Sequence, residues 1–268
     1  MLRAIKRMVK SLVSLFGYEL TSQKLCELAD DPLAVMSLLL PRDEVSVIVD
    51  GGASIGDTSE RFSAFFPNAR VYAFEPFPSF VESLQKKAAS NPHIKVCPLA
   101  LDQKIGYRTL CINDSEGTNS LLEPKNVENN PYGSLLSKKG EIQVKTTSLD
   151  KIFPTETIDI LKLDLQGGEY DALSGAKKLL KEGRINSILC ETMFVKQYEE
   201  QRNWADLVSL IGDSGFRIFN FYQIHFDHGR ILQADALFVR QDSYDKIINI
   251  CQNHFMSFSK FTNRNLIN

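Results

Sequence analysis

Short apolar runs alternate with amphipathic stretches over most of this chain. Five runs have the length and composition of buried strands: residues 45–49, 70–74, 94–102, 158–164 and 185–191. The stretches between them place apolar residues at helical spacing and predict helices at residues 57–66, 78–90, 169–180 and 204–211. This alternation predicts the α/β class, with a doubly wound, mostly parallel sheet and right-handed crossovers.

Two regions depart from this rhythm. Residues 106–112 and 141–147 alternate like half-exposed strands and predict an inserted β-hairpin. The polar segment between them, residues 113–140, is expected to be a substrate loop or a mobile lid. Further along, residues 216–226 and 234–240 predict an antiparallel hairpin that closes the sheet.

The same pattern suggests three parts: an N-terminal helical extension over residues 1–42, a main domain over 43–242 and a helical tail over 243–268. Pro32 and Pro41 are expected to interrupt the extension. Residues 1–20 are basic and amphipathic. They could pack on the domain or on a second subunit, or make weak contact with an anionic membrane surface.

Composition narrows the function classes. The 268 residues are 43% hydrophobic and 24% charged, with a net charge of -2, which argues against nucleic-acid binding. No apolar stretch approaches the ~20 residues of a membrane span. Five scattered cysteines without a C-x-x-C spacing suggest neither a disulfide framework nor a zinc site. A cytoplasmic location is expected, with peripheral contact at the inner membrane face left open.

Acidic residues stand at the predicted carboxyl ends of the strands: Asp50, Glu75, Asp102, Asp164 and Glu191. The carboxyl ends of parallel strands meet at one edge of a sheet, which is where such sheets bind their ligands. We therefore expect a ligand site at this edge, with several carboxylates around it.

The first strand runs into a glycine-rich turn that contains Gly51, Gly52, Ser54 and Gly56. The spacing nearly matches a dinucleotide-binding turn, but a pyrophosphate should avoid the adjacent carboxylate of Asp50. S-adenosylmethionine has no phosphate and carries positive charge, so the turn favours this cofactor, held closely by the glycine backbone. A nicotinamide-dependent oxidoreductase and a non-catalytic nucleoside-binding module remain as alternatives.

The second and third strands offer further cofactor contacts. Glu75, followed by Pro76, stands where an acidic residue accepts hydrogen bonds from ribose hydroxyls. Leu101 and Asp102 could flank the adenine as an apolar wall and as an acceptor for its amine, or lie in a surface turn.

Methyl transfer requires an aligned acceptor and a group that takes its proton. Asp164 is the first candidate, because its strand end should face the transferred methyl group. The other candidates are Glu191, His225, His228 and Asp235. His225 and His228 flank Asp227 and could also bind a divalent cation, or be solvated turn residues. Glu169 either takes part in the site or caps its helix.

Residues for acceptor recognition are expected mainly in the polar segment. Asn119, Ser120 and Tyr132 offer amide and hydroxyl groups, which suit a sugar because they donate and accept hydrogen bonds at short range. Gln166 lies close to Asp164 in the sequence and is expected to contact the acceptor as well.

Taken together, these motifs resemble the FkbM family of S-adenosylmethionine-dependent O-methyltransferases. The matching segments, in chain order, are residues 49–56, 73–76, 118–121, 148–150, 161–169, 173–176 and 235–239. The resemblance implies a class I methyltransferase fold, which is Rossmann-like, and a hydroxyl acceptor. Members of the family commonly act on sugars of polysaccharides, glycolipids or secondary metabolites. This chain has Gln166 where the family often has Glu, and Ser54 where it often has Asn.

Overall fold

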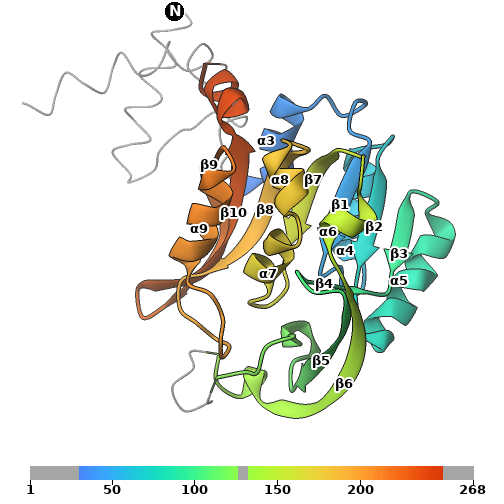
Figure 1. Cartoon of the computed structure of the whole chain (residues 1–268), viewed down its shortest axis with the longest axis vertical. Coiled ribbons are helices and arrows are strands. Elements are labelled where there is room, and N and C mark those ends of the chain that lie inside the picture. Colours follow the sequence, from blue (N-terminus) through green and yellow to red (C-terminus); the bar gives the residue numbers. More distant parts are fainter. Residues whose placement is uncertain (1–29, 126–131, 250–268) are drawn as a thin grey trace, which may run out of the picture.

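A seven-stranded sheet forms the centre of the molecule in the computed structural model, which describes residues 30–125 and 132–249 (Figure 1). Its strand order is β3 (Ile94–Cys97), β2 (Arg70–Phe74), β1 (Val47–Gly51), β7 (Ile158–Leu163), β8 (Ile185–Met193), β10 (Arg230–Arg240) and β9 (Phe216–Asp227). The first five strands in this order are parallel, whereas β10 runs antiparallel to both of its neighbours. The predicted doubly wound sheet and closing hairpin are confirmed.

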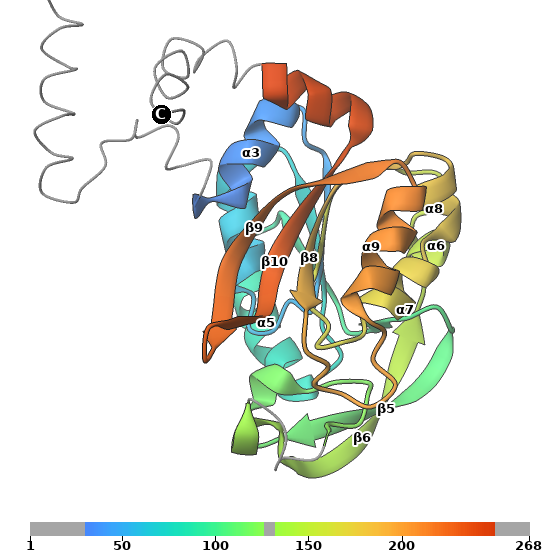
Figure 2. The same ribbon diagram turned by 90° about the vertical axis from the view of Figure 1, so that its left-hand side faces the viewer.

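Helices cover both faces of this sheet, as Figure 2 shows. One face carries α3 (Pro32–Leu39), α4 (Asp57–Phe65) and α5 (Pro78–Ser90). The other carries α6 (Leu149–Ile152), α7 (Glu169–Ser174), α8 (Lys177–Lys181) and α9 (Trp204–Asp213). Each face has its own apolar core, because strands buried on both sides place alternate side chains into the two helical layers.

The inserted hairpin belongs to a second, smaller sheet. Its strands, in order, are β4 (Ala100–Leu101), β6 (Lys138–Thr147) and β5 (Gly106–Asn113), with β5 and β6 antiparallel. In the described part of the connection between β5 and β6 lie the short 3-10 helices η1 (Glu116–Thr118) and η3 (Gly133–Leu136). The small sheet lies beyond the carboxyl ends of the main strands (Figure 1), so it faces the predicted ligand edge. The apolar run at 94–102 therefore contributes to two sheets rather than to one strand.

Two glycine positions determine how the first turn packs. Gly52 has a φ of 72°, and a Cβ there would lie 1.8 Å from the carbonyl oxygen of Asp164. Gly56, at φ 93°, precedes α4, and a Cβ there would lie 2.6 Å from a methyl carbon of Leu84. Only glycine lets the turn after β1 approach the end of β7 this closely.

The break expected at Pro32 is present, because residue 30 is helical, Asp31 is not, and α3 begins at Pro32. Proline fits the first helical position, and the Asp31 carboxylate caps α3 by accepting from the Leu33 N–H at 2.8 Å. One prediction about a helix was wrong. The single helix expected at 169–180 is two helices. The Asp150 carboxylate accepts from the first N–H groups of α8, those of Lys178 and Leu179, and so starts a new helix there.

The ends of the chain fall partly outside the described residues. Residues 241–249 are helical, as expected of the tail. The predictions for residues 1–20 lie outside the described residues. Within residues 30–125 and 132–249, no helix is both long enough and apolar enough to cross a membrane.

Candidate functional site

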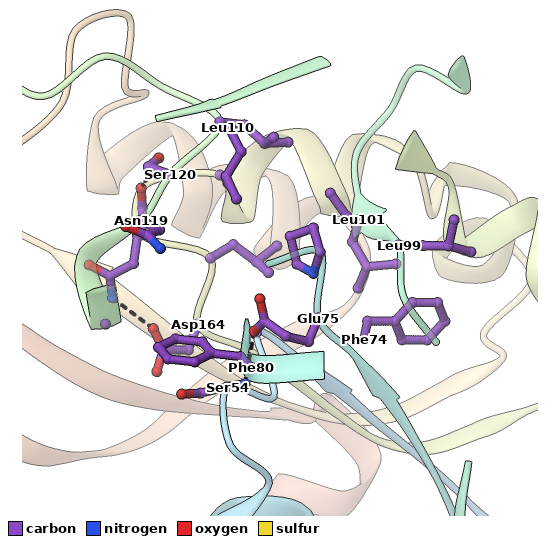
Figure 3. A pocket seen from close by; sticks show the side chains of 18 of the residues that line it. Ser54, Phe74, Glu75, Phe80, Leu99, Leu101, Leu110, Asn119, Ser120 and Asp164 are labelled. Atoms are coloured by element: carbon purple, nitrogen blue, oxygen red, sulfur yellow. Dashed lines mark hydrogen bonds between the residues drawn. The ribbon is translucent and has the colours of Figure 1, made fainter. Parts of the chain in front are cut away.

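A cavity of about 210 Å³ lies at the carboxyl ends of β2 and β7 (Figure 3). It is bounded by the glycine-rich turn after β1 (residues 51–56, the first turn) and by the inserted module, which consists of the small sheet with η1 and η3. Many residues predicted from the sequence line it: Gly52, Ser54, Glu75, Pro76, Leu101, Asn119, Ser120, Asp164 and Gln166. Residues from five separate stretches of the chain therefore meet at the predicted edge of the sheet.

The cavity has an apolar end and a polar end. Figure 3 shows Leu99, Leu101 and Phe74 on one side of Glu75, with Asn119, Asp164 and Ser54 on the other. Leu110 and Phe80 also line the cavity, and Figure 3 shows Phe80 on the same side of Glu75 as Asp164 and Ser54. Such a cavity suits a ligand that has a flat apolar part at one end and charged groups at the other.

Glu75 is held rigidly between the two ends. Its Oε2 accepts from the Ser54 N–H at 2.9 Å, and its Oε1 accepts from the Phe77 N–H at 2.8 Å. Burial raises the pKa of Glu75 above its ordinary value, and these two N–H donors oppose the shift. Each oxygen keeps a second lone pair, so the carboxylate can still accept hydrogen bonds from a ligand.

Asp164 and Gln166 form part of the polar end. The Gln166 Nε2 donates to Asp164 Oδ1 at 2.9 Å and to Glu191 Oε2 at 3.1 Å. Gln166 Oε1 accepts from the Tyr198 hydroxyl at 3.0 Å, and the Ser120 hydroxyl donates to the Gln166 backbone carbonyl at 2.7 Å. Gln166 thus joins two carboxylates to the inserted module. It also lines the cavity, and its contact with the acceptor stays a prediction.

Lys162 is a site residue that the sequence analysis did not single out. It is buried beneath the first turn, and its Nζ lies 3.2 Å from Asp50 Oδ1 and 3.6 Å from Asp164 Oδ2. It also donates to the Gly52 carbonyl at 3.0 Å. Burial alone would lower the pKa of Lys162, but Asp50 and Asp164 raise it above its ordinary value, so the side chain stays charged. The sequence signal that could have identified Lys162 as a site residue was its position within an otherwise apolar strand.

Asp50 does not line the cavity, which differs from the sequence prediction. Its side chain is fully buried, with Oδ2 accepting from the Ser59 hydroxyl at 2.6 Å and Oδ1 paired with Lys162. The carboxylate points into the layer below the turn because Asp50 is still part of β1. Gly51 and Gly56 likewise shape the turn without lining the cavity.

Asp102 also differs from its predicted role beside the adenine. It follows β4 of the small sheet, is fully buried and is bound by Arg108 at 2.7 Å. Leu101 lines the cavity, but the Asp102 carboxylate is occupied by the guanidinium instead.

The remaining acids lie next to the cavity. Glu191 and Asp235 are directly opposite each other on β8 and β10. Burial, followed by the charges of Asp164 and Glu169, raises the pKa of Glu191 well above its ordinary value. Burial and the charge of Asp164 raise the pKa of Asp235 to about 6. Glu169 accepts from the N–H of Leu165 at 2.7 Å, which fixes the turn after β7.

His225 and Tyr132 lie outside the cavity lining. His225 is exposed on β9, opposite Gln233. The Tyr132 hydroxyl donates to the Gln233 Oε1, and Gln233 in turn donates to Glu191 Oε1 at 3.1 Å. His228, at the hairpin turn, pairs with Asp227. Within the described part of the chain, no group of three His, Cys, Asp or Glu side chains could hold a metal ion.

Comparison with known proteins gives a consistent family match. Residues 50–218 match the model of the methyltransferase FkbM domain. The chain is 27% identical to the methyltransferase sdnD of Sordaria araneosa, over 64% of this chain and 73% of that protein. It is also 27% identical to the 2-O-methyltransferase NoeI of Sinorhizobium fredii, over 66% of this chain and 74% of that protein.

A solved structure with the same family name is also similar. The methyltransferase FkbM from Methylobacillus flagellatus KT superposes with a TM-score of 0.47 at 16% sequence identity. The similarity covers 80% of this chain and 49% of that one, so this chain spans about half of its length.

Proposed function

Because this chain belongs to the FkbM methyltransferase family, we propose that it transfers a methyl group from S-adenosylmethionine to a hydroxyl oxygen of a carbohydrate. The observation that carries the proposal is the overlap between the family match and the cavity. The match begins at Asp50, in the strand that enters the first turn, and includes every segment that lines the cavity.

The cavity fits the cofactor chemically. Leu99 and Leu101 would flank the adenine, and the Glu75 carboxylate would accept from the ribose hydroxyls. Asp164, whose side chain is 40% exposed at the polar end, would pair with the ammonium of the methionine part. Bound there, S-adenosylmethionine supplies a methyl group already activated by a sulfonium.

The first turn is unsuited to the pyrophosphate of a nicotinamide cofactor. The N–H groups of Gly52 and Ala53 both donate to the Phe74 carbonyl at 3.0 Å. The first turn of α4 carries Asp57 and Glu60, which oppose an anion at a helix N-terminus. These observations favour a cofactor without phosphate.

Asp164 is our candidate for the group that orients the acceptor hydroxyl and takes its proton. It lines the cavity, and its carboxylate is oriented by Gln166 on one side and Lys162 on the other. Glu191 lies behind it, joined through the same Gln166 amide, and would influence its charge. A sugar hydroxyl is a weak acid, so an oriented carboxylate would assist the transfer.

The acceptor class rests on two observations. A relative of this chain is named as a 2-O-methyltransferase, which supports oxygen as the accepting atom. The cavity lining also contains amide and hydroxyl side chains, those of Ser54, Ser120 and Gln166. Groups of this kind recognise neutral polyols by short hydrogen bonds.

We also propose that the chain divides into three parts at residues 42 and 242, that the protein is cytoplasmic, and that its acceptor is a small molecule or a glycan. The three described cysteines, Cys97, Cys111 and Cys190, are buried and free, in keeping with a reducing compartment. Subunit association or membrane contact through residues 1–20 can be tested by deleting them and measuring assembly state and vesicle binding.

The function is tested by incubating the full chain with methyl-labelled S-adenosylmethionine and a panel of glycans, followed by mass spectrometry. Label on a sugar oxygen supports the proposal, and label on another acceptor class contradicts the carbohydrate part. Cofactor binding without any methylated product would favour a non-catalytic binding module. Parallel reactions with a chelator test whether a divalent cation takes part.

A further inference from the structure

The cavity as a whole has an excess of negative charge. Its lining includes the carboxylates of Glu75, Glu116 and Asp164, whereas no Lys, Arg or His is among the described residues that line it. The methionine part of S-adenosylmethionine carries an ammonium and a carboxylate. Carboxylates in the lining can pair with the ammonium, but the ligand's own carboxylate needs hydrogen-bond donors.

Two of the side-chain donors around the polar end are already engaged. The Ser120 hydroxyl donates to the Gln166 carbonyl at 2.7 Å. The Gln166 Nε2 is shared between Asp164 and Glu191. Lys162 lies behind the turn, where it pairs with Asp50 and does not line the cavity.

Asn119 is different. Its Nδ2 is buried from solvent and has no hydrogen-bond acceptor among the described residues, although the side chain lines the cavity. A buried donor without a partner costs about 1–3 kcal/mol, so an amide left this way suggests that a ligand group completes it.

The orientation of this amide is determined by its neighbour. The Asn119 Oδ1 accepts from the backbone N–H of Asn113 at 2.9 Å. Because only the oxygen of the amide can accept that hydrogen bond, the nitrogen must be the atom that remains without an acceptor. The loop is held in place by the Asn113 Nδ2, which donates to the Thr118 carbonyl at 2.6 Å. In Figure 3, Asn119 and Asp164 lie at the same end of the cavity, beyond Glu75.

We infer that Asn119 donates, through Nδ2, to the carboxylate of the methionine part of S-adenosylmethionine, while Asp164 pairs with its ammonium. This inference rests on the proposed cofactor and reassigns Asn119 from acceptor recognition to cofactor recognition. It gives the inserted module a part in cofactor binding, since Asn119 follows η1 in the connection between β5 and β6.

The test compares two ligands by calorimetry with the full chain: S-adenosylmethionine and its decarboxylated form, which keeps the sulfonium and the ammonium. Asn119→Ala should weaken binding of S-adenosylmethionine about tenfold or more, the value of a charge-assisted hydrogen bond, and leave the decarboxylated ligand unaffected. Asn119→Asp has nearly the same shape and adds a negative charge. Asn119→Asp should weaken the binding of S-adenosylmethionine further, and it should bind the decarboxylated ligand at least as tightly as the wild type does.

Asn113→Ala is the matched control. It loosens the same loop without removing the Asn119 amide, so it should affect both ligands equally. Equal losses for both ligands in the two Asn119 variants, or no loss in either, would overturn the inference while the proposed function stands. A wild-type chain that binds neither ligand would overturn the cofactor assignment together with this inference.

Discussion

The Nζ of Lys162 lies 3.2 Å from Oδ1 of Asp50, and these two residues are register partners on the neighbouring strands β7 and β1. Both side chains are buried, and the ammonium also donates to the carbonyl oxygen of Gly52 at 3.0 Å. The pair therefore ties β7, the strand directly before Asp164, to the turn that lines the cavity. Asp50 acts on the site through this pair.

Lys162→Met should lower the free energy of unfolding by about 3–5 kcal/mol, because it leaves the buried Asp50 carboxylate without its cation. Urea denaturation measures the loss. Adding Asp50→Asn to this variant should recover part of it, since the unpaired charge is then gone. Lys178→Met is the control: its exposed pair with Glu182 should contribute less than about 1 kcal/mol. Equal effects of Lys162→Met and Lys178→Met would contradict the role of the buried pair.

Glu75→Gln should weaken binding of S-adenosylmethionine and of 5′-methylthioadenosine to the same extent, by about tenfold or more. Both ligands contain the ribose that the carboxylate is expected to bind. In addition, Glu75 now accepts hydrogen bonds from two backbone N–H groups, and the glutamine amide would turn its NH₂ group toward one of them. Calorimetry with the two ligands gives the comparison. A loss confined to S-adenosylmethionine would assign Glu75 to the methionine part of the ligand instead.

Asp164→Asn should lower kcat by about 100-fold or more if its carboxylate takes the acceptor proton, and it should also weaken cofactor binding about tenfold, because the same carboxylate pairs with the ammonium of the methionine part. Steady-state kinetics and calorimetry separate the two effects. Asp171→Asn is the matched control, because Asp171 is an acid of α7 that contacts Gln103 and does not line the cavity. Wild-type turnover in Asp164→Asn would remove Asp164 from the chemistry.

The main sheet could be predicted from the sequence because the positions of its buried residues repeat with the spacing of strands and helices. The small sheet was predicted in part. β5 and β6 alternate clearly, but Ala100 and Leu101 of β4 continue an apolar run and gave no signal of a second sheet. The passage of the chain from the main sheet into β4 also explains why the prediction for Asp102 was wrong. Asp102 was expected at the ligand edge, but in the fold it follows β4 and pairs with Arg108.

Side-chain pairing between distant strands was the part that the sequence could not supply. Asp50 and Lys162 are far apart in the chain, and only the parallel register of β1 and β7 makes them neighbours. The contact between Gln166 and Glu191 could not be predicted from the sequence either, because it depends on the left-handed backbone of Gln166 at φ 53° in the turn after β7. Residue types identified the edge of the sheet, but not which carboxylates face the ligand.

Glu169→Gln should flatten the pH dependence of stability. Burial raises the pKa of Glu169 from its ordinary value of 4.5 to about 7. A carboxyl that holds its proton more tightly when folded stabilises the protein below about pH 4.5, and this contribution is lost as the pH rises through about 7. The wild type should therefore lose stability over this range relative to the variant.

Both backbone N–H groups that Glu169 accepts, those of Leu165 and Gly167, donate to Oε1. An amide oxygen in the same position can accept them, so the glutamine variant should keep the turn. Urea midpoints measured at a series of pH values give the result, and parallel curves for the two proteins would contradict the raised pKa.

Gly52→Ala should abolish cofactor binding and destabilise the fold, because its Cβ would lie 1.8 Å from the Asp164 carbonyl oxygen at a φ of 72°. A contact this short with backbone cannot be relieved by a side-chain rotation, so either the turn after β1 or the end of β7 must move. Both of these segments line the cavity. Gly212→Ala is the matched control, since Gly212 lies in α9 with nothing within 4 Å of its added Cβ. It should be neutral or stabilise by up to about 1 kcal/mol, as alanine does in helices. Thermal unfolding and calorimetry distinguish the two variants, and an intact affinity in Gly52→Ala would mean that the first turn does not hold the cofactor.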